Sequence, residues 1–384
     1  MSNVYSPTDP RFAHLGPEKF RLRQTDAVLL DAKFETKPIG FFRDAAMRFA
    51  KSKISIVALI AISIIGFMAI VGPYMTPYGY NDQNLDYINL PPKIPALARF
   101  GIFQGTRVLQ NRRVDGLSDT SRYPEGSIIR IDNRRVMGGV ELCDVTVDYY
   151  RYMGIDDDVY FLFGTDYLGR DLWTRVWRGT RVSLIIAIVS VICNVSIGLV
   201  YGSIAGYYGG SIDMTMMRIT EIIDAMPDVV VVTLFILYFG SGLISIILAL
   251  AVKNWIGTAR MIRGQFYRFK NHEYVLAART LGANDARLMF RHILPNSIGP
   301  IITRAMIAIP SAIFTESFLA YIGLGIRAPE SSIGVLLSEG QKVLLYYPEQ
   351  TFFPAVIISI LMIGFNLLSN GLRDAFDPTQ RGTE

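Results

Sequence analysis

Long apolar stretches without a charged residue recur along the chain and alternate with polar segments. Three of them cover residues 54–72, 182–205 and 352–368. Each is close to the roughly 20 residues that an α-helix needs to cross the hydrocarbon core of a bilayer. The pattern therefore predicts membrane-spanning helices, and the fold class that it indicates is an all-α polytopic membrane protein.

A fourth apolar stretch, residues 229–252, is interrupted by a Gly-Ser-Gly sequence at 240–242. It can form one spanning helix, or it can belong to two helices that meet at an outer turn. The following segment, residues 259–300, carries seven Arg and Lys residues against two acids, and short basic loops stay in the cytoplasm. Basic residues just before the first span place that end in the cytoplasm as well. With the N-terminus in the cytoplasm, a single helix here would place the basic segment outside the cell, whereas two helices place it in the cytoplasm. We therefore predict two helices.

Six spans with both termini in the cytoplasm follow from this choice. Arg304 is expected to snorkel at the cytoplasmic end of the fifth span. Pro295 is expected to break the chain before that span, because proline interrupts helical hydrogen bonding. The spans are predicted at residues 54–73, 182–206, 212–239, 243–266, 301–326 and 350–371.

The polar segment at residues 77–163 separates the first two spans and predicts an insertion on the outer side of the membrane. Its charges are mixed, and long translocated loops do not follow the charge rule. Within it, residues 126–133 and 140–149 alternate apolar and polar positions, which is typical of half-buried strands. We therefore expect a small β-containing cap, with Met137-Gly138-Gly139 near the turn.

Composition supports the membrane assignment and excludes several kinds of chemistry. Hydrophobic residues make up 51% of the chain and charged residues 18%, against about 25% charged residues in soluble domains. Two cysteines cannot form a disulfide framework, and no HExxH, CxxC or phosphate-loop pattern is present. Basic cytoplasmic loops explain the formal charge of +5 without nucleic-acid binding.

The stretch between the fourth and fifth spans holds a short helix pattern. Asn271 is expected to cap its start and Gly282 its end. Tyr274, Ala278 and Leu281 fall on one face at helical spacing. The small residues leave room for another surface to approach closely. On the pattern alone, a surface amphipathic helix between two spans is an equally good interpretation.

This stretch resembles the EAA motif of ABC importer permeases, in which an Ala-Ala pair, a later Gly and a Leu-Pro lie in a cytoplasmic loop. The matching residues here are Ala277, Ala278, Gly282, Leu294 and Pro295, whereas Leu276 replaces the leading acid of the family. In the family this loop is the coupling helix that docks in a groove of the ATPase subunit. The resemblance implies an ATPase-coupling role for Glu273, Tyr274, Ala277, Ala278, Arg279 and Gly282.

Three further stretches resemble the C-type permease subunit of the oligopeptide, dipeptide and nickel branch. They are residues 164–171, 316–325 and 365–378. Two positions depart from that pattern, Asn370 where an Asp is common and Ile333 where a Trp is common. The resemblance covers about residues 40–75 and 160–380, and the outer insertion is not part of it.

The resemblance implies the six-helix fold of type I ABC importer permeases and half of a translocation pathway for peptides, with oligopeptides preferred. It implies no catalytic residue, no metal and no cofactor in this chain, because ATP and Mg would be bound by two partner ATP-binding subunits. The other partners implied are a homologous B-type permease, an extracytoplasmic peptide-binding lipoprotein and membrane lipid, in a bacterial plasma membrane. Dipeptide and nickel-chelate cargo stay open, as does whether the insertion docks the binding protein or braces the partner permease.

Two other classes of function are weighed against this one. A secondary transporter driven by an ion gradient would need intramembrane carboxylates as a relay, and Glu221, Asp224 and Glu316 are the candidates. The same three residues are the candidates for the lining of a translocation pathway. A membrane hydrolase would need a metal or nucleophile cluster, and His272 and His292 lack metal-ligand spacing.

Each charged candidate also has a structural interpretation. The charged residues before and at the start of the second span form either a salt-bridged outer collar, or a gate or a contact for the binding protein; they are Asp166, Arg170, Asp171 and Arg175. Glu316 makes a structural hydrogen bond or lines the pathway. Pro227 predicts a kink after the two acids on the third span, and Arg218 is placed to neutralise Glu221.

The predicted organisation is an N-terminal cytoplasmic segment at 1–52, a first span at 53–76, the insertion at 77–163, a permease core at 164–372 with a coupling loop at about 267–299, and a cytoplasmic tail at 373–384.

Overall fold

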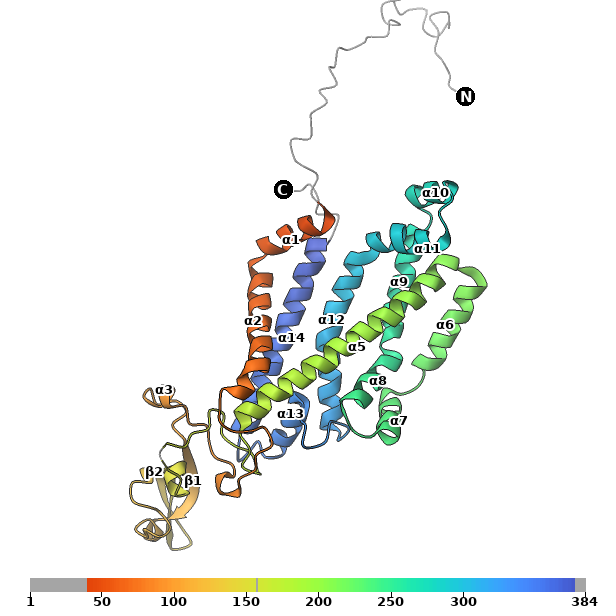
Figure 1. Cartoon of the computed structure of the whole chain (residues 1–384). Helices are drawn as coiled ribbons and strands as arrows, with labels where there is room; N and C mark the ends of the chain where they lie inside the picture. The colour runs from red at the N-terminus through yellow and green to blue at the C-terminus, as the bar shows by residue number, and fades with distance from the viewer. Residues whose placement is uncertain (1–39, 157, 377–384) are drawn as a thin grey trace, which may run out of the picture. The chain divides into compact units, whose positions relative to one another are not determined.

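The computed structural model describes residues 40–156 and 158–376 (Figure 1). The chain divides into two units, residues 1–44 and 45–384, and the architecture below is that of the second. The cytoplasmic segment predicted for residues 1–52 and the tail predicted for 373–384 lie largely outside the described residues.

Helices dominate the described part of the chain. Five of its helical segments are long and apolar enough to cross a membrane, and a sixth span results if the bent pair α6 and α7 counts as one. The helices are α1 (Phe41–Lys51), α2 (Lys53–Val71), α3 (Pro95–Ala98), α4 (Tyr149–Tyr152), α5 (Leu172–Tyr208), α6 (Gly210–Asp224), α7 (Asp228–Phe239), α8 (Leu243–Lys253), α9 (Trp255–Phe269), α10 (Glu273–Thr280), α11 (Asp285–Arg287), α12 (Leu294–Tyr321), α13 (Ile333–Lys342) and α14 (Glu349–Phe376).

The third predicted span, residues 212–239, is not one continuous helix. α6 and α7 are bent by 78° at the break that separates them. Pro227 lies in this break and explains it, because proline has no N–H to donate and disfavours helical backbone at the residue before it. The predicted kink is confirmed, and it is sharp enough to divide the predicted span into two helices. The turn predicted at residues 240–242 is also confirmed, since it separates α7 from α8.

The fifth span begins earlier than predicted and ends earlier as well. From Asp285 the helical path runs through α11 and the π-helical segment η6 (Leu288–Ile293) directly into α12. The prediction that Pro295 breaks the chain is wrong, because this proline occupies the first turn of α12, where an N–H is not needed. α12 stops at Tyr321 because Gly323 adopts a φ of 86°, a left-handed conformation that suits glycine.

The helical body is held together by a shared apolar core and by close packing between helices. A buried core is shared by α2, α5, α12, α13 and α14 and includes Val176, Ile313 and Leu361. The long helix α5 crosses the body and packs tightly on α9 (Figure 1). Glycine permits this approach, because a Cβ at Gly202 would collide with the carbonyl oxygen of Ala259.

The outer insertion contains a three-stranded antiparallel sheet, with strands β1 (Thr106–Arg113), β2 (Ile128–Met137) and β3 (Val140–Asp148) in the order β1-β3-β2. Val145 on the central strand pairs with Leu109 and Ile131 and is fully buried. The two predicted strands and the turn near Gly138 are confirmed. The first strand was missed because its polar and basic residues do not alternate with apolar ones.

The sheet and the short helix α10 lie at opposite ends of the helical body (Figure 1). α10 lies at the same end of the helical body as the start of α2 and the end of α14 (Figure 1). At the other end, the insertion has a core of its own formed by Leu90, Tyr150 and Phe161, and the Tyr150 hydroxyl donates to the Pro91 carbonyl at 2.9 Å. This arrangement places a helix and a sheet on the two opposite sides of the predicted membrane.

Candidate functional site

The helix α10 is held in place by hydrogen bonds at its two ends. His272, and not the predicted Asn271, occupies the N-cap position, and its backbone carbonyl accepts from the Val275 N–H at 3.0 Å. At its end, Gly282 has a φ of 86°, and its N–H donates to the Arg279 carbonyl at 3.0 Å. The Ala283 N–H donates to the Ala278 carbonyl at 3.1 Å. These two bonds form a Schellman motif, so the predicted helix end at Gly282 is confirmed.

One side of α10 is anchored to the helical body. Val275 is fully buried, and Ala278 packs against the same apolar cluster. The Arg279 guanidinium donates to the Tyr207 hydroxyl at 3.0 Å, and that hydroxyl donates to Asp285 at 2.6 Å. The Arg279 side chain is therefore engaged within this chain and ties α10 to α5.

Three apolar side chains of α10 and of its C-terminal cap are exposed. We call Tyr274, Leu276 and Leu281 the α10 patch; their exposed fractions are 39%, 43% and 88%. Burial on its inner edge raises the pKa of the Tyr274 hydroxyl, which accepts a hydrogen bond from the Asn296 amide at 3.2 Å. Of the predicted face, Tyr274 and Leu281 are exposed, whereas Ala278 packs on the cluster that contains Val275. Exposed apolar patches of this kind mark surfaces that partners cover.

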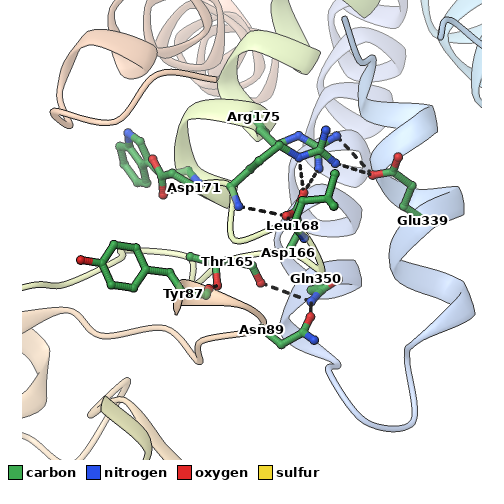
Figure 2. A network of polar contacts seen from close by, with 11 residues as sticks. Tyr87, Asn89, Thr165, Asp166, Leu168, Asp171, Arg175, Glu339 and Gln350 are labelled. Atoms are coloured by element: carbon green, nitrogen blue, oxygen red, sulfur yellow. Dashed lines mark hydrogen bonds and ion pairs between the residues drawn. The ribbon is translucent and has the colours of Figure 1, made fainter. Parts of the chain in front are cut away.

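A buried ion-pair network lies near the outer end of α5 (Figure 2). The Asp166 carboxylate accepts from the Arg170 side chain at 2.7 Å and from the Arg175 side chain. Arg175 also pairs with Glu339 of α13 at 3.2 Å. Asp166, Arg170 and Arg175 are each at most 3% exposed. The predicted salt-bridged collar is present, whereas a gating role stays a prediction.

Asp171 is not part of this network. Its carboxylate caps α5, accepting from the Trp173 N–H at 3.3 Å and the Thr174 N–H at 3.1 Å. It also accepts from the Thr76 hydroxyl at 3.1 Å, which ties the end of the first span to the start of the second. This cap explains why α5 begins at Leu172, ten residues before the predicted span at 182–206, which lies entirely within this helix.

Sequence reasoning missed the partners that join the collar to the last two helices. The Gln350 amide of α14 donates to Asn89 at 2.8 Å and to the Thr165 carbonyl at 3.2 Å (Figure 2). Glu339 and Gln350 carry no sequence signal, because each is a single polar residue in a mixed segment far along the chain. Gln350 therefore ties Asn89 of the outer insertion to α14, and Glu339 ties α5 to α13.

The three intramembrane carboxylates have separate partners. Glu316 is fully buried and accepts from the Ser183 hydroxyl at 3.0 Å and from the Ser332 hydroxyl. Its structural hydrogen bond is therefore present. Glu221 pairs with Arg218 at 2.6 Å, as predicted, and Asp224 pairs with Arg260 at 3.0 Å. The structure does not bring the three together, and their role in a pathway stays a prediction.

Comparison with known proteins places these features in a family. Residues 198–382 match the family described as binding-protein-dependent transport system inner membrane component. Residues 40–92 match the N-terminal TM domain of oligopeptide transport permease C. Both matches agree with the resemblance found in the EAA-like stretch.

Three relatives show how far the similarity extends. The oligopeptide transport system permease protein OppC of Bacillus subtilis is 36% identical over 91% of this chain and 93% of its own length. The dipeptide permease protein DppC of the same organism is 35% identical over 89% of this chain and 87% of its own. The glutathione permease protein GsiD of Pectobacterium atrosepticum is 37% identical over 56% of this chain and 71% of its own. The chain therefore belongs to the inner membrane permease components of binding-protein-dependent transport systems, in the C-type branch of the oligopeptide and dipeptide permeases.

Proposed function

We propose that the chain is the C-type permease subunit of an ATP-driven peptide importer and forms half of its translocation pathway. The observation that carries the proposal is the similarity to oligopeptide and dipeptide permease subunits over about nine tenths of the chain. Oligopeptides are the preferred cargo. The chain itself catalyses no reaction, and two partner subunits bind ATP and Mg²⁺ and hydrolyse the nucleotide.

The α10 patch is the surface through which the ATPase subunits act. α10 is anchored to α5 and to the start of the α12 span, so a push on it moves both. Its neighbourhood is basic, which favours the cytoplasmic side of a bacterial plasma membrane. Both termini lie on that side, and the insertion lies outside, where a peptide-binding protein delivers cargo. A homologous B-type permease completes the pathway.

Reconstitution of the complete importer in lipid vesicles tests the proposal. The vesicles contain ATP and Mg²⁺, and binding protein with a labelled pentapeptide is added outside. We expect the peptide to accumulate in the lumen with ATP but not with a non-hydrolysable analogue. An ionophore is expected to leave the rate unchanged. Accumulation that needs an imposed ion gradient and no ATP would instead identify a secondary transporter.

A further inference from the structure

The side of α12 that faces away from the core presents a stripe of exposed residues. They recur every three or four positions, as Arg304, Ile307, Ser311, Phe314, Phe318 and Tyr321. Two adjoining cavities lie along this stripe, because Asn254 and Thr315 line both of them. Their volumes are about 160 and 360 Å³. Together they form one groove between α5, α7, α8, α9 and α12, which we call the α12 groove.

The smaller cavity is polar and contains an unsatisfied acceptor. Asn194 of α5 is 4% exposed, and its side-chain oxygen has no hydrogen-bond partner. A buried polar atom without a partner is destabilising, and such atoms in native proteins are rare. Asn254, Thr258 and Ser311 add further hydrogen-bonding groups to the wall. The cavity is therefore suited to a ligand that donates a hydrogen bond to Asn194.

Arg304 supplies the charge in the same cavity. It lies within the helical segment Asp285–Tyr321, a candidate span, and its position at the cytoplasmic end of the membrane stays a prediction. Within residues 40–156 and 158–376, no carboxylate pairs with its guanidinium. A Cβ added to Gly257 would lie 2.8 Å from an Arg304 nitrogen, so this glycine leaves the room that the guanidinium occupies. Arginines inside a membrane span are costly, and they mark ligand pathways.

The larger cavity differs in character. Phe314, Phe318 and Val229 give it apolar walls, and an ion pair of 2.6 Å between Lys253 and Asp228 lines it as well. Ten positions separate Arg304 from Phe314, which is about 15 Å along an α-helix. An extended peptide advances about 3.3 Å per residue, so about four to five residues reach from one cavity to the other.

We propose that the α12 groove is a binding site for the cargo peptide during its passage through this subunit. Arg304 binds the terminal carboxylate, the Asn194 oxygen accepts from a peptide N–H, and the larger cavity receives an apolar side chain nearer the amino end. The proposal rests on the proposed function of peptide import. It assigns to this chain a preference for free carboxylates that is independent of the external binding protein.

The test compares two cargoes in the reconstituted importer. One is a pentapeptide with a free carboxylate, and the other is the same pentapeptide with a C-terminal amide. Import rates are measured for the wild type, Arg304→Met, Arg304→Lys and the control Arg130→Met. Arg130 is a surface residue of the outer sheet, 72% exposed and paired with Asp132. The binding protein is the same in all cases, so its own cargo preference cancels when the import rate of each variant is divided by the wild-type rate for the same cargo.

We expect Arg304→Met to slow import of the free acid about tenfold, the effect of losing one charged hydrogen bond, and to change import of the amide less than twofold. Arg304→Lys is expected to restore most of the rate, and Arg130→Met to match the wild type for both cargoes. Stimulation of ATPase activity by the loaded binding protein checks that each variant is folded and assembled. Equal slowing of acid and amide, or no slowing, in an assembled Arg304→Met importer would overturn the inference. Failure of the wild type to import either peptide would instead contradict the proposed function.

Discussion

Replacing Leu281 by aspartate is expected to lower peptide import at least about tenfold while leaving the subunit folded. Leu281 is 88% exposed in this chain, so the substitution removes no internal packing. In the assembled importer the α10 patch is covered by an ATPase subunit, and a charge placed in that apolar contact would be desolvated without a partner. The measurement is ATP-driven import together with ATPase stimulation in reconstituted vesicles.

Two control variants isolate the contact. Leu281→Met keeps the apolar surface and is expected to retain import. Leu345→Asp changes a leucine that is 92% exposed between α13 and α14, away from α10, and is expected to leave ATPase stimulation intact. Full import by Leu281→Asp would show that no partner covers the patch. Ala278→Asp and Gly282→Asp are weaker tests, because Ala278 is partly buried and Gly282 needs a left-handed backbone.

Replacing Asp166 by alanine is expected to destabilise the subunit by about 3–5 kcal/mol, the typical loss when one partner of a buried ion pair is removed. Asp166 neutralises Arg170 and Arg175, which are both at most 3% exposed. Among the residues that the structure describes, only Glu339, whose side chain is 29% exposed, would then remain to compensate two buried cations. Unfolding of the purified subunit in mixed micelles measures the change.

Asp132→Ala is the matched control for this substitution. It removes the carboxylate of an exposed pair, since the side chains of Arg130 and Asp132 are 72% and 39% exposed. Exposed pairs contribute about 0–1 kcal/mol, because water screens them. If both alanine variants lose the same small amount, the collar does not hold the outer ends of α5 and α13 together.

The sequence predicted the spans best where apolar runs are long. A run without charges can only be buried in lipid or in a core, so the first and last spans were located closely. Helix ends were placed less well, because they depend on single contacts. Asp171 extends α5 outward through hydrogen bonds that need Thr76 from another segment. Pro295 predicts the end of a helix when only the sequence is considered. In the structure it lies in the first turn of α12, directly after a π-helical segment.

The candidate site was predicted only in part, because the direction of each side chain depends on tertiary packing. The stretch around α10 was found from its Ala-Ala-Arg and Gly282, but its exposed face was not, since Val275 decides which side turns inward. The partner of Glu221 was predicted because Arg218 lies one helical turn before it, whereas the partners of Glu316, Ser183 and Ser332, come from distant segments and are identified only by the structure. The α12 groove has no local signal, because Asn194 of α5, Asn254 between α8 and α9, and Arg304 of α12 come from distant parts of the chain.

The orientation of α10 is the claim on which the importer assignment depends most directly. A cysteine at position 281, in a background with Cys143→Ser and Cys193→Ser, can be probed with a membrane-impermeant maleimide. We expect no labelling in intact cells, and labelling in permeabilised cells that contain the subunit without its ATPase partners. A cysteine at position 345 in the same background is expected to react in intact cells. Reaction of the cysteine at 281 from outside intact cells would contradict the account, because no cytoplasmic ATPase could then reach α10.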